Sequence, residues 1–153
     1  MSVYKVVTLP DELLRSRALP VKQINEGVIR VLDNMKDTLY AADGVGLAAP
    51  QIGIPKRIIV VDPGENYLEL INPEIISAEG SQTGREGCLS IPDTVGIVER
   101  AQKVTVKALN RNNEEIIIEG EELLARVLQH EIDHLDGILF IDKAVQIKSN
   151  NPR

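Results

Sequence analysis

The pattern His130-Glu131-Ile132-Asp133-His134 constrains this chain most, because it contains the only two histidines among 153 residues. Residues four apart in a helix lie on one face, so both imidazoles would project in the same direction. Two neutral imidazoles at this spacing can bind one divalent metal ion, and the glutamate between them can carry protons for an attacking water. The alternative is that both histidines are solvated or core residues. The pattern alone leaves the choice open.

The segment that carries this pattern is predicted to be a helix from Glu121 to Asp136. Its apolar residues recur at helical spacing and form one broad face, and Gly137 follows as a C-terminal cap. An apolar face this broad is typical of a helix buried against β-sheets. The apolar positions are Leu123, Leu124, Val127, Leu128, Ile132 and Leu135.

A second helix is predicted from Val21 to Ala42, where the apolar residues also follow a helical period and Asp43-Gly44 is a stop signal. Most of the other patterned segments are strands. They are residues 57–62 and 67–71, joined by a turn at Pro63-Gly64, and residues 103–109 and 115–119, joined by a turn at 110–113. Runs of strands with few helices predict an α+β fold, with antiparallel or mixed β-sheets packed around the histidine-bearing helix.

Composition limits the class of protein. The length fits one domain covering residues 1–153, and we find no repeat or linker. A single cysteine excludes an intramolecular disulfide and favours a reducing, cytoplasmic setting. No signal-like or membrane-spanning apolar stretch is present, so no membrane association is expected. The net charge of -6 argues against nucleic acid as the main partner, so no direct nucleic-acid site is predicted.

A hydrolytic metal site needs a third protein ligand and an open position for water. With no third histidine, the candidates are Cys88 or a carboxylate. Cys88 lies in Glu86-Gly87-Cys88-Leu89-Ser90, where Gly87 allows the backbone to approach closely. The alternative is that Cys88 is a small buried hydrophobic residue, as free cysteines often are.

The segment from Gly44 to Gln51 is predicted to be a loop of small residues. It follows a helix and lacks a Gly-Lys-Ser/Thr ending, so it is a poor match to a phosphate-binding loop. Its glycines either meet the needs of a tight connection or expose backbone groups to a bound peptide. Gln51 offers a neutral amide donor, which suits a developing oxyanion.

Taken together, these segments resemble the peptide deformylases. The three family motifs appear in order as G-V-G-L-A-A-P-Q (44–51), E-G-C-L-S (86–90) and H-E-I-D-H (130–134), and residues 9–15 resemble the family's opening segment. The resemblance therefore covers nearly the whole chain.

By that resemblance, Cys88, His130 and His134 bind one divalent metal ion per chain. Iron(II) is expected, and zinc, nickel or cobalt would be able to substitute. Glu131 would take a proton from the attacking water and pass one to the departing amine. Gln51 and the backbone amide of Leu89 would stabilise the oxyanion. The substrate would be the N-formyl group of formyl-methionyl nascent peptides, with formate released.

The resemblance also places substrate-binding residues around Gly46, which with its neighbours Gly44, Val45 and Leu47, and with Gly87, would hold the peptide in extended form. The methionine side chain needs an apolar slot. Leu123 and Val127 lie on the helix face of His130 and His134, so they are expected to line it, with ordinary core packing the alternative for Leu123. Val45 would close the other side.

The chain departs from the family pattern in two places. Residues 91–96 lack the arginine that members often carry after the cysteine motif, so contacts with the distal peptide are expected to differ. No long basic C-terminal helix follows residue 143, which leaves at most transient ribosome contact. Two alternative functions fit parts of this pattern. An endopeptidase with the same helix would need a further histidine or glutamate ligand, and a non-catalytic metal-binding module would need a fourth ligand.

Overall fold

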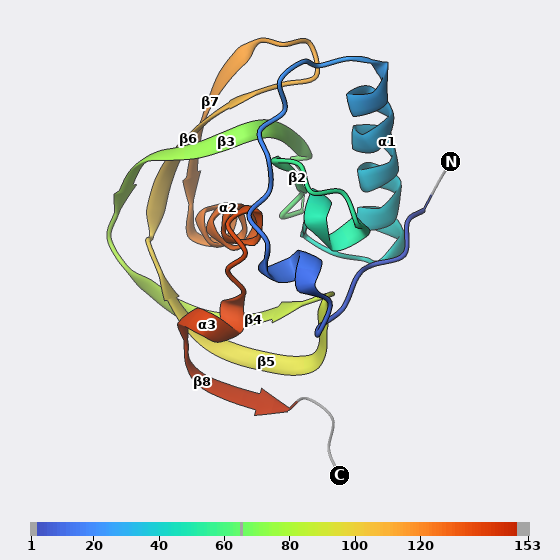
Figure 1. The fold of residues 1–153 in the computed structure, drawn as a ribbon. Helices are drawn as coiled ribbons and strands as arrows, with labels where there is room; N and C mark the ends of the chain where they lie inside the picture. The colour runs from blue at the N-terminus through green and yellow to red at the C-terminus, as the bar shows by residue number, and fades with distance from the viewer. Residues whose placement is uncertain (1–2, 65, 150–153) are drawn as a thin grey trace.

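Two antiparallel β-sheets lie on either side of one helix in the structure, a computed structural model that describes residues 3–64 and 66–149 (Figure 1). The first sheet has the strand order β1-β2-β3-β6-β7, and the second has the order β4-β5-β8. The strands of the first are β1 (Gly46–Ala48), β2 (Ile58–Val61), β3 (Leu68–Glu79), β6 (Lys103–Leu109) and β7 (Glu115–Glu121). Those of the second are β4 (Gln82–Cys88), β5 (Ile91–Arg100) and β8 (Ala144–Ser149). The expected α+β fold with antiparallel sheets is confirmed.

The helix between the sheets is α2 (Glu122–Leu135), and it carries both histidines. Its apolar side packs with β2, β3 and β6 in one core cluster that includes Ile59, Leu70, Val104 and Leu128. Gly137, just after the helix, has a φ of 75°, the left-handed conformation expected of a C-terminal glycine. The predicted helix and its stop signal are thus confirmed to within a residue.

Helix α1 (Glu26–Ala41) begins later than the predicted Val21. Asn25 accounts for the difference, because its side chain accepts a hydrogen bond of 3.0 Å from the Val28 amide and so caps the first turn. The buried face of α1, with Leu32, Met35 and Leu39, packs against β1 and β2 and forms a second core cluster.

Several elements were not predicted. The segment 44–51 contains β1 and the 3-10 helix η2 (Ala49–Ile52), so the prediction of a loop was wrong there. The strands β4, β5 and β8 and the short helices η1 (Glu12–Arg15) and α3 (Phe140–Lys143) also carried no clear pattern. Strand β3 continues to Glu79, well beyond the predicted segment 67–71. By contrast, β2 and β6 match the predicted strands, and the predicted turn after β6 places Asn113 at a φ of 61°.

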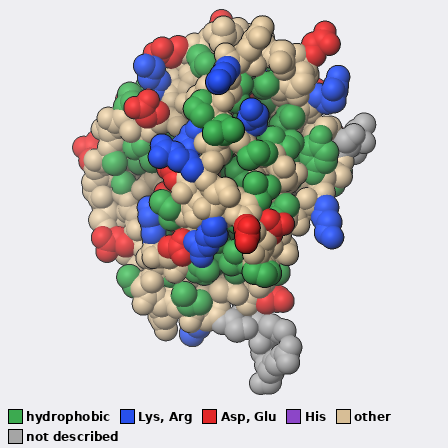
Figure 2. Space-filling model, in the orientation of Figure 1, with side chains coloured by type: hydrophobic (Ala, Val, Ile, Leu, Met, Phe, Trp, Pro, Cys, Tyr) green, Lys and Arg blue, Asp and Glu red, His purple; other side chains and the backbone are tan. Residues whose placement is uncertain are grey.

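Positive and negative side chains are mixed with apolar ones over the face drawn in Figure 2. Among the described residues, no helix is long and apolar enough to cross a membrane. Residues 150–153, on which the expectation about a C-terminal extension depends, lie outside the described residues.

Candidate metal centre

Three side chains that can ligate a metal come together where β4 meets α2. The ligand atoms of Cys88, His130 and His134 all lie within 4.8 Å of one another. The sulfur of Cys88 is 3.3 Å from Nε2 of His134, and the two imidazole centroids are 5.1 Å apart. Cys88 ends β4, and its sulfur faces the helix that presents both histidines. The sequence had left the third ligand open between Cys88 and a carboxylate, and the structure brings Cys88 to this position.

His130 is oriented by Glu86, which is not among the site residues predicted from the sequence. Nδ1 of His130 lies 2.8 Å from a carboxylate oxygen of Glu86, so the other ring nitrogen is left for a metal. Burial would raise the pKa of Glu86, but hydrogen bonds from Arg100 and His130 outweigh it and lower the pKa to about 2. Glu86 is therefore an ionised acceptor at neutral pH. Its position two residues before Cys88 on a strand, hence on the same face, was a usable signal.

Two buried arginines complete this charged cluster. Arg100 donates to both oxygens of Glu86, at 2.7 and 2.8 Å, and also to Asp133 at 2.8 Å. Arg126 donates to Glu86 as well. Both guanidinium groups come from outside the three motifs, and nothing in the local pattern distinguished them from surface arginines. These two guanidinium groups hold the Glu86 carboxylate in place. Removing either one would leave buried charge uncompensated, which is strongly destabilising.

The two histidines differ in their electrostatic surroundings. Burial lowers the pKa of His134 to about 3, with the charges of His130 and Arg100 acting in the same direction. Burial would also lower the pKa of His130, but its contacts with Cys88 and Glu86 and the charge of Glu131 raise it to about 10. The negative groups around His130 thus favour positive charge there, which a bound metal ion would supply in place of the proton.

Glu131 lies beside this cluster with one oxygen, Oε1, buried and without a hydrogen-bond partner among the described residues. Burial raises its pKa to about 7, although the charge of His130 opposes the shift. Gly46 of β1 makes room for this side chain, since a Cβ at Gly46 would lie 2.6 Å from Oε2 of Glu131 and 2.8 Å from Val127. The carboxylate therefore reaches past β1 toward open space.

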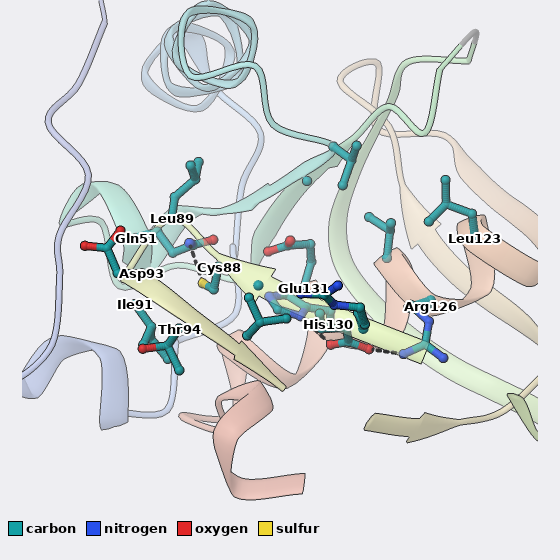
Figure 3. Close-up of a pocket in the computed structure, with 17 residues that line it drawn as sticks. Gln51, Cys88, Leu89, Ile91, Asp93, Thr94, Leu123, Arg126, His130 and Glu131 are labelled. Atoms are coloured by element: carbon teal, nitrogen blue, oxygen red, sulfur yellow. Dashed lines mark hydrogen bonds and ion pairs between the residues drawn. The ribbon is translucent and has the colours of Figure 1, made fainter. Parts of the chain in front are cut away.

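That open space is a pocket of about 400 Å³ whose wall includes Cys88, His130 and Glu131 (Figure 3). In Figure 3, Gln51, Cys88 and Leu89 lie on one side, Leu123 and Arg126 on the other, and Glu131 and His130 between them. Most of the predicted substrate-binding residues also line it. These are Val45, Gly46, Gly87, Leu123 and Val127.

Two predicted substrate-binding residues lie elsewhere. The side chain of Leu47 is fully buried in the core cluster beneath α1, because successive residues of β1 face opposite sides and Ala48 faces the other cluster, beside α2. Gly44 precedes β1 and is not part of the pocket wall. Leu123, in contrast, is 49% exposed at the pocket rim, so the alternative of ordinary core packing does not hold for it.

Gln51 is held on both sides of its amide. Its carbonyl oxygen accepts from the Ala48 amide at 2.9 Å, and its Nε2 donates to Ser90 at 3.1 Å and lies 3.5 Å from the Cys88 sulfur. These contacts fix which end of the amide faces the cluster. Gln51 thus presents its donor, and not its acceptor, to the pocket.

A cysteine sulfur, two imidazoles and a buried carboxyl group beside an open pocket are typical of hydrolases that use a divalent metal ion. The chain belongs to the polypeptide deformylase family, whose model matches residues 3–150. It is 69% identical over 148 residues to the peptide deformylase of Syntrophomonas wolfei subsp. wolfei, covering 97% of each chain.

Solved structures agree. The peptide deformylase of Thermotoga maritima superposes with a TM-score of 0.93 at 40% identity, over 95% of this chain and 100% of that one. A Met-Ala-Ser-bound class I type b peptide deformylase from Acinetobacter baumannii gives a TM-score of 0.90 at 37% identity, over 94% and 99% of the two chains. The comparisons confirm the predicted family and the predicted reaction, hydrolytic removal of the N-formyl group from nascent polypeptides, and favour it over an endopeptidase or a non-catalytic module.

Proposed function

We propose that this chain performs the deformylase reaction in the pocket between β1, β4 and α2, with one divalent metal ion held by Cys88, His130 and His134. The convergence of these three ligand atoms within 4.8 Å carries the proposal. The donor set fits a first-row ion, because one thiolate and two imidazoles leave a side open to the pocket. When bound, the metal polarises the formyl carbonyl and makes water a stronger nucleophile at neutral pH.

Iron(II) is the proposed native ion, with zinc, nickel and cobalt able to replace it. Iron(II) beside a thiolate is prone to oxidation, so an iron-loaded enzyme should lose activity in air faster than a nickel-loaded one. Metal analysis of anaerobically purified protein tests the assignment directly. Equal decay of the two loaded forms in air would count against iron.

Glu131 is proposed to move the proton. Its carboxylate lies beside His130, is buried, and reaches the pocket through the space that Gly46 leaves. From there it accepts a proton from the attacking water and returns one to the amine as the amide bond breaks. Its unpartnered buried oxygen supports this role, since a folded protein rarely leaves a buried carboxylate oxygen without a partner for structural reasons.

The oxyanion is proposed to be stabilised by Gln51 and the backbone amide of Leu89. The Nε2 of Gln51 already lies near the Cys88 sulfur, and Leu89 follows Cys88 directly in the pocket wall. Both donors are neutral and fixed in place, so they stabilise developing negative charge without reorganising.

The substrate is proposed to be a formyl-methionyl peptide bound in extended form. Both β1 and β4 are edge strands of their sheets, and residues of both line the pocket, so a peptide between them would find unpaired backbone groups. Val45 and Leu123 form an apolar rim, and Val127 lies deeper, which suits a methionine side chain. The Met-Ala-Ser tripeptide bound to the Acinetobacter baumannii relative is consistent with this class of ligand.

We further propose that the enzyme acts in the cytoplasm on chains leaving the ribosome, which it contacts at most transiently. The decisive experiment measures formate release from formyl-Met-Ala-Ser and acetyl-Met-Ala-Ser by metal-replete protein prepared without oxygen. Turnover of the formyl peptide alone is expected, because a small site excludes the added methyl group. Failure to release formate, or equal turnover of both peptides, would rule out the proposal.

A further inference from the structure

Arg126 lies where the wall of the pocket meets the charged cluster beside the metal ligands. It belongs to α2 and lines the pocket (Figure 3), and only 7% of its surface is exposed. An arginine buried this deeply needs partners for its donors. Its partners therefore show what the side chain holds in place.

Those partners are all on the hairpin formed by β4 and β5. One terminal nitrogen of Arg126 donates to the Glu86 carboxylate and, at 3.1 Å, to the Val98 carbonyl, and the other lies 3.4 Å from the Gln82 carbonyl. The guanidinium group thus spans both strands of the hairpin. It forms a planar, multiply bonded contact that a lysine could not reproduce.

The strand is shaped to receive this group. Gly84 lies opposite the guanidinium, and a Cβ at Gly84 would be 3.2 Å from one terminal nitrogen of Arg126 and 3.3 Å from Cζ. Gly84, Glu86 and Cys88 are every second residue of β4, so all three face the same side of the strand, toward α2. The row that accepts Arg126 is therefore the row that ends in the proposed thiolate ligand.

This arrangement joins the two elements that supply the ligands. Arg126 lies one helical turn before His130, and Glu86 lies two residues before Cys88 while also bonding His130. Arg100 holds Glu86 too, but from β5, and it does not line the pocket. Among the arginines of the cluster, Arg126 alone reaches both Glu86 and the pocket.

We infer that Arg126 is a positioning residue, which docks β4 on α2 through Glu86 and thereby sets the spacing of Cys88 from His130 and His134. Because its side chain is also part of the pocket wall, the same residue shapes the slot beside the metal. The inference rests on the proposed metal site. It differs from a purely stabilising salt bridge, which would affect folding without changing how the ligands converge.

The test compares Arg126→Met, Arg126→Lys and a matched control, Arg57→Met. Methionine keeps an apolar wall while removing every donor, and lysine keeps the charge without the planar contact. Arg57 anchors the far end of α2, bonding the Leu135 carbonyl at 2.9 Å and Asp136 at 3.0 Å, without contacting Glu86 or the pocket. It therefore perturbs the docking of the same helix just after His134, without bonding Glu86 or a ligand side chain.

Each variant is titrated with Co²⁺, whose visible and thiolate charge-transfer absorption reports ligand geometry, and its melting temperature and its KM and kcat for formyl-Met-Ala-Ser are measured. Arg126→Met should weaken Co²⁺ binding by about 10–100-fold, the usual effect of removing a group that orients metal ligands, change the spectrum and raise KM. Arg126→Lys should recover part of the loss. Arg57→Met should lower the melting temperature but weaken Co²⁺ binding less than Arg126→Met does, because Arg57 bonds backbone and Asp136 and not Glu86 or a ligand side chain.

Wild-type Co²⁺ affinity and spectrum in Arg126→Met would overturn the inference, as would an equal loss of affinity in Arg57→Met at a matched fall in melting temperature. If Arg126→Met does not fold, the same measurements on Arg126→Lys decide the matter, since unchanged affinity there would also overturn it. Wild-type protein that binds Co²⁺ and releases formate isolates this result from the proposed function. If the wild type does neither, it is the proposed function that fails.

Discussion

The surroundings of Glu131 are hard to explain by folding stability alone. It is 4% exposed, has one oxygen with no hydrogen-bond partner in the part of the chain that the structure describes, and lies against a glycine that leaves it space. Each feature is unfavourable for stability, because buried carboxylates without partners are costly. Such an arrangement is typical of a group kept for chemistry, since perturbed titratable residues concentrate at functional sites.

Replacing Glu131 with alanine should separate metal binding from catalysis. Since Glu131 is not among the three converging ligands, Glu131→Ala should keep its metal and lose activity by at least ~10²-fold, the usual scale for a positioned acid or base. Formate release and bound metal are measured on one preparation. A metal-replete variant with near-native turnover would remove Glu131 from the mechanism.

Gln51→Ala should lower kcat by roughly 10²–10³-fold while metal content stays unchanged, if its amide stabilises the oxyanion. The same amide also bonds Ala48 and Ser90, so the variant should lose about 1 kcal/mol of stability per hydrogen bond removed. Gln51→Glu should be at least as harmful to turnover, because it places negative charge beside the developing oxyanion.

Ser90→Ala is the matched control for Gln51. It removes the Gln51–Ser90 hydrogen bond but keeps the amide donor in the pocket. It should therefore lower the melting temperature with little effect on kcat. If Gln51→Ala and Ser90→Ala behave alike, Gln51 has a structural role only.

Among the elements, those with strong local periodicity were predictable. Helix α2, strands β2 and β6 and the turn after β6 followed from apolar spacing and turn residues, because these signals act over a few residues. The start of α1 was missed because the apolar period extends back to Val21, whereas the helix begins where Asn25 caps its first turn. Strand β8 was missed because it is defined by pairing with β5 across some fifty residues of chain. Strands β4 and β5 form a local hairpin and were missed because their residues show no clear alternation of apolar and polar side chains.

The same division holds for the candidate site. The motifs identified Cys88, His130, His134, Glu131 and Gln51. The structure places four of them in the wall of one pocket, and the fifth, His134, lies behind them with its Nε2 3.3 Å from the Cys88 sulfur. The residues that hold them in place were not predictable, because their roles depend on contacts between elements. Arg100 is the example: it comes from β5, a strand that the sequence did not reveal, and meets Glu86 across the hairpin.

The close approach of β1 to α2 gives a prediction at this scale. Gly46→Ala would place a methyl group on Glu131 and Val127, and overpacking of this kind costs about 1–3 kcal/mol. If that free energy destabilises the position of Glu131 needed in the transition state, kcat/KM drops by roughly 5–150-fold. Gly44→Ala is the control, since its Cβ would meet Leu39 and Leu89 and not the carboxylate. Equal kinetics for the two variants would show that the spacing of β1 and α2 does not matter for catalysis.

At the scale of the whole molecule, the metal ligands come from two layers of the fold. Cys88 ends a strand of the second sheet, while both histidines are on the helix packed against the first sheet. A bound ion would therefore connect the two layers in a chain that has no disulfide. Because such a site does not exist in the unfolded chain, metal binding should contribute to the stability of the whole fold.

Removing the metal should consequently lower the melting temperature of the whole molecule. An ion present at 100 times its dissociation constant stabilises the folded state by about 2.7 kcal/mol. For a chain of this size each kcal/mol corresponds to about 2–4 °C, so treatment with a chelator should lower the melting temperature by roughly 5–10 °C. Scanning calorimetry of the metal-loaded and chelator-treated wild type measures the shift.

Cys88→Ala should show little further shift with chelator, because its site is already incomplete. A wild-type melting temperature that ignores the chelator while the metal is demonstrably lost would mean that the ion does not join the layers, and that the β4–α2 contact through Glu86 and the two arginines is sufficient by itself.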